Sequence, residues 1–231
     1  MIAEQARVDW RIQYTFVQYV CPFVLFLLFL ALGNSLPIQP SWEGALRVSV
    51  MAAVCLFCFP REISLAPRYW VLSTLVGAAV FAIWIAPDVL IPGYRQSILF
   101  SNSLVGHAQS SVPAALFGSP WVLLWRCLRA IVIVPIVEEL FWRGWLMRWL
   151  IDSNFKRVPL GTYRPSAFWM TAILFASEHG PYWDVGLVTG VIYNAWMIRT
   201  KSLADCILMH AVTNSVLCAY VIGSHQWQYW Q

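Results

Sequence analysis

Two adjacent carboxylates at the end of an apolar run are the residues of this chain best placed to do chemistry. Glu138 and Glu139 directly follow the apolar residues 132–137. An ionisable residue within a membrane span costs roughly 2.5–3.5 kcal/mol on insertion scales, so such residues usually mark a functional site. Arg143 follows Glu139 by four residues, the spacing and order that favour an ion pair on a helix. This pairing would keep Glu139 ionised and leave Glu138 free to act as a general base for water.

Two histidines and one amide on other apolar segments supply the remaining groups that a hydrolytic site needs. His179 ends the apolar segment 168–179, and Phe175 lies one helical turn before it, where its ring could wall a pocket. His179 could orient the same water and pass its proton to a leaving amine. His210 and Asn214 are four residues apart on one helical face, and their N–H groups could stabilise an oxyanion.

Each of these elements also has an ordinary structural explanation. The two acids could lock helices together through Arg143 or Arg129, and a histidine at a helix end is usually a hydrogen-bonded structural residue. His210 and Asn214 could join helices by hydrogen bonds. The complete set, an acid pair with two histidines and an amide on three apolar segments, favours catalysis, because the chain has only four histidines in all.

The composition predicts the elements that must position these residues. The chain has 231 residues, of which 60% are hydrophobic and 11% charged, and its mean hydropathy is +0.64. We therefore expect an all-α, polytopic transmembrane bundle of about seven spans, because helices satisfy their own backbone groups in lipid. The expected spans are 16–36, 46–59, 69–90, 121–150, 166–179, 185–198 and 203–222. The first run is longer than the apolar part of a signal peptide, so we expect it to be retained.

We expect residues 1–231 to form a single integral membrane domain. Residues 121–224 would carry the catalytic core and residues 1–120 the accessory spans. With the N-terminus placed in the cytoplasm, ten of the 15 Lys and Arg residues fall on the cytoplasmic side, two on the far side and three inside the fourth span. This bias predicts a multi-pass protein of the cell membrane with its C-terminus on the far side. The net charge of +4 then reflects topology, with the lipid bilayer as neighbour and no nucleic acid partner.

Two further features bear on the site. The six cysteines lie in or beside the expected spans, and Cys55 and Cys58 have no second pair, so we interpret all six as small buried hydrophobes. The interval 91–119 is the longest polar stretch and could cover an entrance.

The motifs resemble a known signature when they are taken in order. Glu138-Glu139-x-x-x-Arg143, Phe175-x-x-x-His179 and His210-x-x-x-Asn214 are similar to the three motifs of the CPBP family, the CAAX-protease and bacteriocin-processing (Abi) membrane proteins. The resemblance covers about the last 110 residues. It implies a glutamate-dependent intramembrane endopeptidase without a cofactor.

The resemblance implies that Glu138 and His179 activate water and that His210 and Asn214 bind the oxyanion. Glu139 and Arg143 match supporting positions. The Trp-rich helix 138–150 is also similar to bacterial CAAX-protease-related proteins found with exosortase systems, which implies such a system as a neighbour. The expected substrate is a membrane-proximal peptide or protein. Residues 1–120 could determine which substrate is selected.

Two alternatives come from the residues themselves. A zinc-dependent hydrolase could use Glu138, Glu139, His179 and His210 as ligands, although the chain lacks a His-Glu-x-x-His segment and Asn214 suits a donor better than a ligand. A non-catalytic membrane scaffold, an immunity protein or a proton-relaying transporter would also bury acids in spans.

The depth of the histidines constrains the geometry. His179 would lie about 20 Å into its span from the cytoplasmic side, whereas His210 would lie only about seven residues into the last span. Convergence then requires tilted or broken helices, for which Gly180-Pro181 is a candidate break, or a deep conical cavity open to the cytoplasm. Glu178 is expected to point roughly 100° away from His179, toward the interface.

Overall fold

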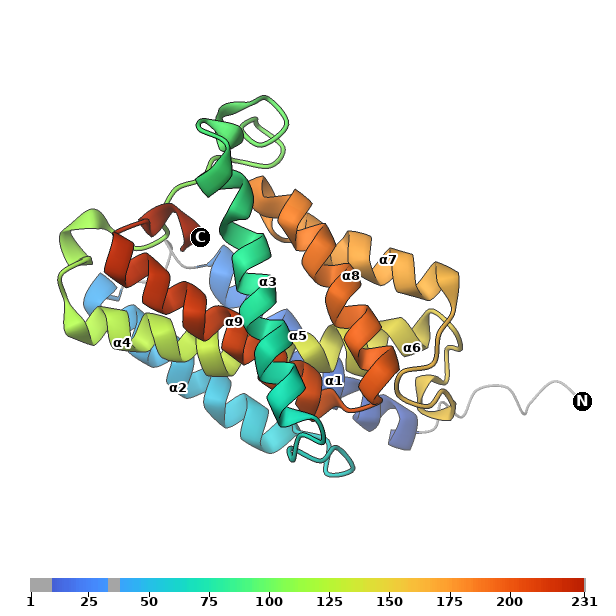
Figure 1. Cartoon of the computed structure of the whole chain (residues 1–231). Coiled ribbons are helices and arrows are strands. Elements are labelled where there is room, and N and C mark those ends of the chain that lie inside the picture. Colours follow the sequence, from blue (N-terminus) through green and yellow to red (C-terminus); the bar gives the residue numbers. More distant parts are fainter. Residues whose placement is uncertain (1–9, 33–37, 231) are drawn as a thin grey trace, which may run out of the picture.

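A computed structural model describes residues 10–32 and 38–230, with side chains from residue 15 onward. Within this part of the chain the regular structure is helical and no β-strand forms. Figure 1 shows the arrangement. The principal helices are α1 (Trp10–Ala31), α2 (Pro40–Cys58), α3 (Trp70–Leu90), a long helix from Pro120 to Trp149, α7 (Pro165–Ser177), α8 (Trp183–Thr200) and α9 (Leu203–Ser224). The predicted all-helical class is confirmed.

Four of these helices are long and apolar enough to cross a membrane: Pro40–Cys58, Trp70–Leu90, Pro120–Trp149 and Leu203–Ser224. They make the chain a multi-pass membrane protein. The second helix begins at Pro40, six residues before its expected start, because proline is well suited to the first helical turn. The expected end of the first span at residue 36 lies outside the described residues.

The long helix departs from regular α geometry on both sides of the acid pair. It begins at α4 (Pro120–Leu128), where the Ser119 hydroxyl caps the first turn. It continues through a π-helical segment η4 (Arg129–Ile133), α5 (Val134–Glu139), a second π-helical segment η5 (Leu140–Leu146) and α6 (Met147–Trp149). Such π segments change the direction of side chains and often occur at functional sites. Glu138 and Glu139 therefore lie in a short α segment between two register changes.

Close helix packing brings the motif helices together. In Figure 1, α3 crosses α9, and α7 lies beside α8. A Cβ atom at Gly77 of α3 would lie 2.4 Å from the carbonyl oxygen of Met209 on α9, so only glycine allows this approach. The Thr213 hydroxyl on α9 lies 3.0 Å from the Gly77 carbonyl oxygen and 3.1 Å from the Met209 carbonyl oxygen, close enough to donate to either. Asp205 at the start of α9 accepts hydrogen bonds from the backbone N–H groups of Arg68 and Tyr69, at 2.8 Å each.

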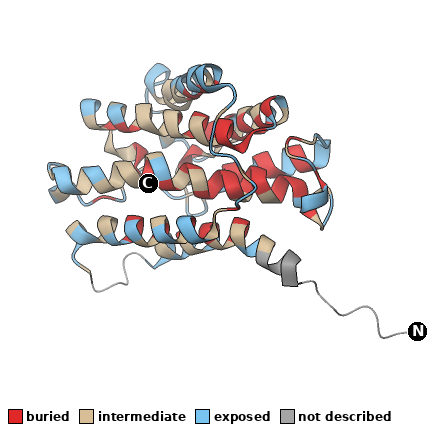
Figure 2. Cartoon of the chain, turned by 90° about the horizontal axis from the view of Figure 1, so that it is seen from below, coloured by how far each residue is buried: buried red, intermediate tan, exposed pale blue. Residues whose placement is uncertain are grey.

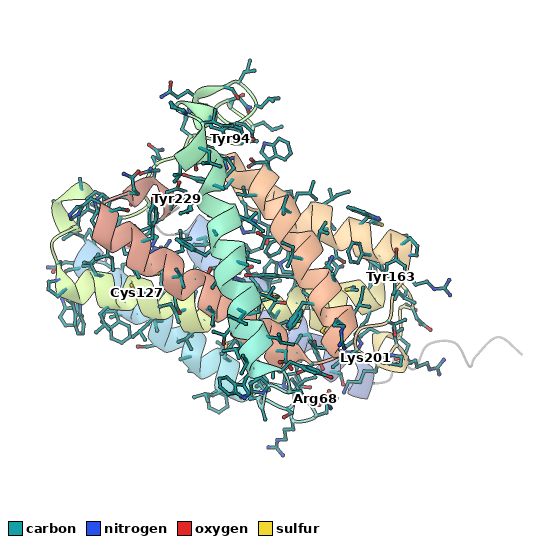
Figure 3. The ribbon with its side chains drawn as sticks, viewed as in Figure 1. Arg68, Tyr94, Cys127, Tyr163, Lys201 and Tyr229 are labelled. Carbon is teal, nitrogen blue, oxygen red and sulfur yellow. The ribbon has the colours of Figure 1, made fainter. Side chains whose placement is uncertain are left out.

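The bundle has two distinct ends. The loop 91–119, the short 3-10 helix η7 (Gly180–Tyr182) and the C-terminal segment 225–230 lie at one end, which we call the C-terminal end. Figure 3 shows Tyr94 and Tyr229 toward this end, whereas Arg68 and Lys201 lie at the opposite end. The backbone N–H of Ser111 donates to the Trp230 carbonyl at 2.7 Å, which joins the loop to the C-terminal segment.

Burial follows the helix contacts. Figure 2 shows buried residues where helices face one another and exposed residues along the outer faces. Large apolar side chains on the outer face of α3, among them Trp70, Leu72 and Leu75, are exposed, as expected of a surface in contact with lipid. The six cysteines are free; Cys55, Cys206 and Cys218 are buried, and the other three are partly buried.

Candidate active site

The four predicted site residues line one cavity. The cavity has a volume of about 450 Å³, and its walls include Glu138, His179, His210 and Asn214, together with Phe175. These side chains come from α5, the turn after α7, and α9, so the fold gathers three separate segments of the sequence. The structure thus brings together the residues that the motifs predicted.

Glu139 lies behind the cavity wall rather than on it. Its Oε1 atom accepts a hydrogen bond from Arg143 Nη1 at 3.1 Å and lies 3.0 Å from His210 Nδ1. Glu139 and Arg143 are both 0% exposed. The predicted ion pair between Glu139 and Arg143 is therefore confirmed. Because a carboxylate oxygen accepts, His210 donates from Nδ1, and its Nε2 atom remains for the cavity.

Arg143 connects the long helix to two neighbours. Its Nε atom donates to Asn194 Oδ1 on α8 at 2.9 Å, and Nη2 lies 3.4 Å from the carbonyl oxygen of Gly190. The amide of Asn194 in turn donates to the Phe168 carbonyl on α7 at 2.9 Å. All three guanidinium nitrogens therefore have partners, and the charge is balanced by Glu139, as a buried cation requires.

His179 is held by its backbone and by aromatic rings. Its Nδ1 atom lies 2.7 Å from the Phe175 carbonyl oxygen, which can only accept, so Nδ1 carries the hydrogen. In the neutral ring Nε2 is then free to accept a proton. The ring lies 5.2 Å from Trp84 and 4.6 Å from Phe175 between centroids. α7 ends at Ser177, just before His179, which supports the expected break near Gly180-Pro181.

Asn214 has a partner in the first π segment. Its Nδ2 atom donates to the Ala130 carbonyl at 2.7 Å. A side-chain amide has a second N–H, which is the donor that an oxyanion could use. The proposed role of Asn214 therefore depends on one of its two hydrogens and stays a prediction.

Glu138 differs from every other residue of the set because its carboxylate is not engaged. Among the described residues it forms no hydrogen bond or ion pair, and its buried Oε2 atom has no partner, although the residue is only 8% exposed. A buried polar atom without a partner is uncommon in native structures and calls for a functional explanation. A carboxylate that lines a cavity in this state can accept a proton from a bound water.

The expectation for Glu178 was wrong. Glu178 does not face away from the site but lines the same cavity as Glu138. The reason is that α7 ends at Ser177, so regular helical spacing does not apply beyond it. The cavity walls include Tyr182, Tyr229 and Trp230, at the C-terminal end of the bundle.

Sequence reasoning missed several other cavity residues. Arg126 and Arg129 line the cavity from the long helix, but the sequence analysis placed them only inside the fourth span, with Arg129 as a possible partner of the acid pair. Their position inside an apolar span was the signal that could have identified them, because an ionisable residue in a span costs free energy, as it does for the acid pair. Tyr193 and Trp84 carry no such signal, because aromatic residues are frequent in every span.

A metal centre would require several ligands in one place. Within the described residues, no group of three or more His, Cys, Asp or Glu side chains is arranged to hold a metal ion. Of the four side chains considered as zinc ligands, Glu139 is paired with Arg143 behind the cavity wall.

Comparisons with known proteins support the motif assignment. A family model described as "Type II CAAX prenyl endopeptidase Rce1-like" matches residues 119–216, the region from the start of the long helix to just past Asn214. No curated protein and no solved structure matches the chain. The matched region contains all three motifs and every residue discussed as catalytic. Residues 119–216 of this multi-pass chain are thus similar to the Rce1-like endopeptidases, which is consistent with the resemblance of its three motifs to the CPBP and CAAX-protease proteins.

Proposed function

We propose that the chain is an intramembrane endopeptidase that hydrolyses a peptide bond with water activated by Glu138 and His179. The observation that carries this proposal is the unpaired carboxylate of Glu138 in a cavity shared with His179, His210 and Asn214. A structural role for Glu138 would require a partner, and the described residues provide none.

The chemistry can be assigned to individual atoms. Glu138 takes one proton from a bound water while the oxygen of that water attacks the carbonyl carbon of the substrate. The carbonyl oxygen becomes an oxyanion, and the C–N bond then breaks. Nε2 of His179 accepts a hydrogen bond from the water, and the proton that Glu138 removed passes to the leaving amine. The products are a carboxylic acid and an amine, and no covalent enzyme intermediate forms.

The oxyanion needs hydrogen-bond donors on the opposite wall. Asn214 offers the second N–H of its amide. Since Nδ1 of His210 donates to Glu139, His210 can donate from Nε2 only when both ring nitrogens carry hydrogen. Glu139 Oε1, which also pairs with Arg143, is the carboxylate oxygen in contact with that ring. This arrangement gives Glu139 a defined role in positioning His210, and each oxyanion donor is worth about 2.7–4 kcal/mol.

The finer assignments follow from the resemblance and from the charge bias. We propose that the substrate is a membrane-associated peptide, which would enter beside the apolar side chains of Phe26, Leu27 and Leu30 of α1. The CAAX prenyl substrate in the family name and an exosortase system as neighbour are candidates to test. A cytoplasmic N-terminus and a C-terminus on the far side remain the proposed orientation. With that orientation the cavity reaches toward the far side of the membrane.

The decisive experiment compares the purified wild type with Glu138→Gln on quenched peptides and membrane substrates, each with and without a zinc chelator. Glutamine keeps size and hydrogen bonding but cannot take the proton, so kcat should fall at least about 100-fold. Glu62→Gln is the matched control, because Glu62 is an exposed glutamate that pairs with Lys156 far from the cavity. We expect no effect of the chelator on wild-type cleavage.

Other outcomes would contradict the proposal. Activity of Glu138→Gln equal to that of the wild type would remove Glu138 from the mechanism. Loss of cleavage with the chelator and recovery with zinc would favour a metal-dependent hydrolase. A cellular phenotype that survives Glu138→Gln would indicate a scaffold.

A further inference from the structure

Arg95 joins three segments at the C-terminal end of the bundle. It belongs to the loop 91–119, and its side chain is 8% exposed. Its Nε atom donates to Oδ1 of Asp88, near the end of α3, at 3.1 Å, and its Nη1 atom pairs with Asp184, in the first turn of α8. Nη1 also donates to the carbonyl oxygen of Pro181 in η7 at 2.7 Å. One guanidinium therefore connects the loop to the end of α3 and to the turn before α8.

That turn is the segment that places the His179 ring in the catalytic cavity. α7 ends at Ser177, and Gly180 has a positive φ of 48°, so the backbone leaves the helix at this point. Within the turn, the backbone N–H of Tyr182 donates to the His179 carbonyl at 2.9 Å. Because the regular helix has ended, the position of the ring depends on contacts from other segments as well.

Aromatic contacts connect Arg95 to the histidine ring. The Arg95 guanidinium lies 4.6 Å from the centre of the Tyr182 ring. Trp84 of α3 stacks on Tyr182 at 6.2 Å between centroids and meets the His179 ring in a T-shaped contact at 5.2 Å. Trp84 precedes Asp88 by four residues, so the two side chains lie on one face of α3. The partners of Arg95 and those of His179 therefore share one helix face and one aromatic ring.

We infer that Arg95 is a positioning residue for the proposed hydrolysis: it holds the turn after α7 so that His179 keeps its place in the catalytic cavity. Arg95 is not among the described residues that line the cavity, so it acts through the turn rather than on the substrate. The inference rests on the proposed function, which assigns His179 to the bound water. A planar guanidinium suits this task because its fixed donors can contact two carboxylates and a carbonyl at once.

The first test compares the kinetics of the wild type, Arg95→Gln and Arg95→Lys on the quenched peptide. Misplacing a catalytic group by about 1 Å can cost about 100-fold in rate, so Arg95→Gln should lower kcat about ten- to hundredfold and change KM less than about threefold. Arg95→Lys should recover part of the loss in kcat, because lysine keeps the charge but cannot contact all three partners.

Arg148→Gln is the matched control, because it removes the same kinds of contact elsewhere in the bundle. Arg148 is buried, donates to the carbonyls of Val158 and Gly144 at 2.8 and 2.9 Å, and lies 5.1 Å from the centre of the Phe155 ring. Both variants should unfold at a lower temperature than the wild type, but the kcat of folded Arg148→Gln should equal that of the wild type. Equal falls in kcat for Arg95→Gln and Arg148→Gln would overturn the inference, and so would an unchanged kcat in Arg95→Gln.

A chemical measurement reports the position of His179 without enzyme activity. Diethyl pyrocarbonate acylates neutral imidazole, and mass spectrometry of peptides resolves the modification of each histidine. The rate at His179 is divided by the rate at His225, an exposed histidine of the same molecule. This ratio should rise at least about threefold in Arg95→Gln, because a loosened turn opens the ring to the reagent, and should not rise in Arg148→Gln.

The same measurement in a Glu138→Gln background separates this inference from the proposed function. A ratio in Arg95→Gln that equals that of the wild type overturns the inference, whatever the activity of Glu138→Gln. If the ratio rises but Glu138→Gln cleaves as fast as the wild type, the hold of Arg95 on His179 stands and the proposed function fails.

Discussion

Arg143 and Arg129 are arginines of one helix in opposite situations. Arg143 is 0% exposed, and each of its guanidinium nitrogens has a partner, with Glu139 as the counter-charge. Arg129 lines a cavity and forms no hydrogen bond or ion pair with the described residues. Glu138 lies between them in the sequence and shares the second situation. The difference separates charges that position the site from charges that are available to a ligand.

The largest effect is expected from a variant that breaks the ion pair of Arg143 with Glu139. Arg143→Met leaves Glu139 as a buried charge without its cation, which costs about 3–5 kcal/mol of folding free energy. Activity should be lost as well, because Glu139 would no longer hold His210 in place. Thermal unfolding in detergent, followed by the loss of helical signal, measures the stability, and the quenched peptide measures the activity.

Arg129→Met is the matched variant, at the arginine that lines the cavity. It removes a charge that has no hydrogen bond or ion pair among the described residues, so stability should stay within about 1 kcal/mol of the wild type or increase. Combining Glu139→Leu with Arg143→Met should restore part of the stability but none of the activity. Equal destabilisation by Arg143→Met and Arg129→Met would show that the two sites do not differ as proposed.

An intermediate effect is expected from Gly186→Ala on α8. A Cβ atom there would lie 3.2 Å from Cγ of His179 and 3.3 Å from its Nδ1, so the ring has to move by a few tenths of an ångström. Misplacing a catalytic group by about 1 Å can cost about 100-fold in rate, and we expect a ten- to hundredfold fall in kcat with little change in stability.

Gly223→Ala provides the control, because a Cβ at Gly223 of α9 would meet nothing within 4 Å. Its kcat and unfolding temperature should match those of the wild type. A Gly186→Ala enzyme of full activity would indicate that His179 does not need its present position.

The sequence was sufficient for those parts of the site that depend on local geometry. Glu139 and Arg143 are one turn apart on the same helix, and so are His210 and Asn214, so spacing alone predicted that the first two would pair and that the last two would lie on one helical face. The three motifs, taken together, predicted that these side chains would meet at one site. The all-helical class followed from composition, since lipid leaves few other ways to satisfy the backbone.

The remaining features depend on departures from the regular helix and on packing between distant segments. Spacing rules assume about 100° per residue, and they fail at the π segments on both sides of Glu138 and beyond the end of α7, where Glu178 lies. The direction of the cavity depends on the C-terminal segment, with Tyr229 and Trp230 in its wall. No periodicity in the sequence shows that Arg143 would be enclosed while Arg129 would face a cavity.

The smallest effect is expected from breaking a charged pair on the surface. The loss of stability there is the reference for the losses expected from the two arginine variants. Lys156 lies 2.5 Å from Glu62 at the end of the bundle opposite the cavity, and both side chains are nearly half exposed. Burial alone would raise the pKa of Glu62, but the hydrogen bond and the charge of Lys156, together with a backbone hydrogen bond and one from Tyr19, outweigh it and hold the pKa below its usual value. The pair therefore stabilises the fold above the ordinary pKa of glutamate, about 4.3, and this contribution is lost as pH falls through the lowered value.

Solvent screening keeps the contribution of such an exposed pair below about 1 kcal/mol. Glu62→Gln should therefore lower stability at pH 7 by no more than this, and the difference from the wild type should disappear in acid and in high salt. Unfolding temperatures measured between pH 3 and pH 7 test the expectation. A loss as large as that of Arg143→Met would mean that burial does not separate the two pairs. The contrast between enclosed and available charges would then need another physical basis.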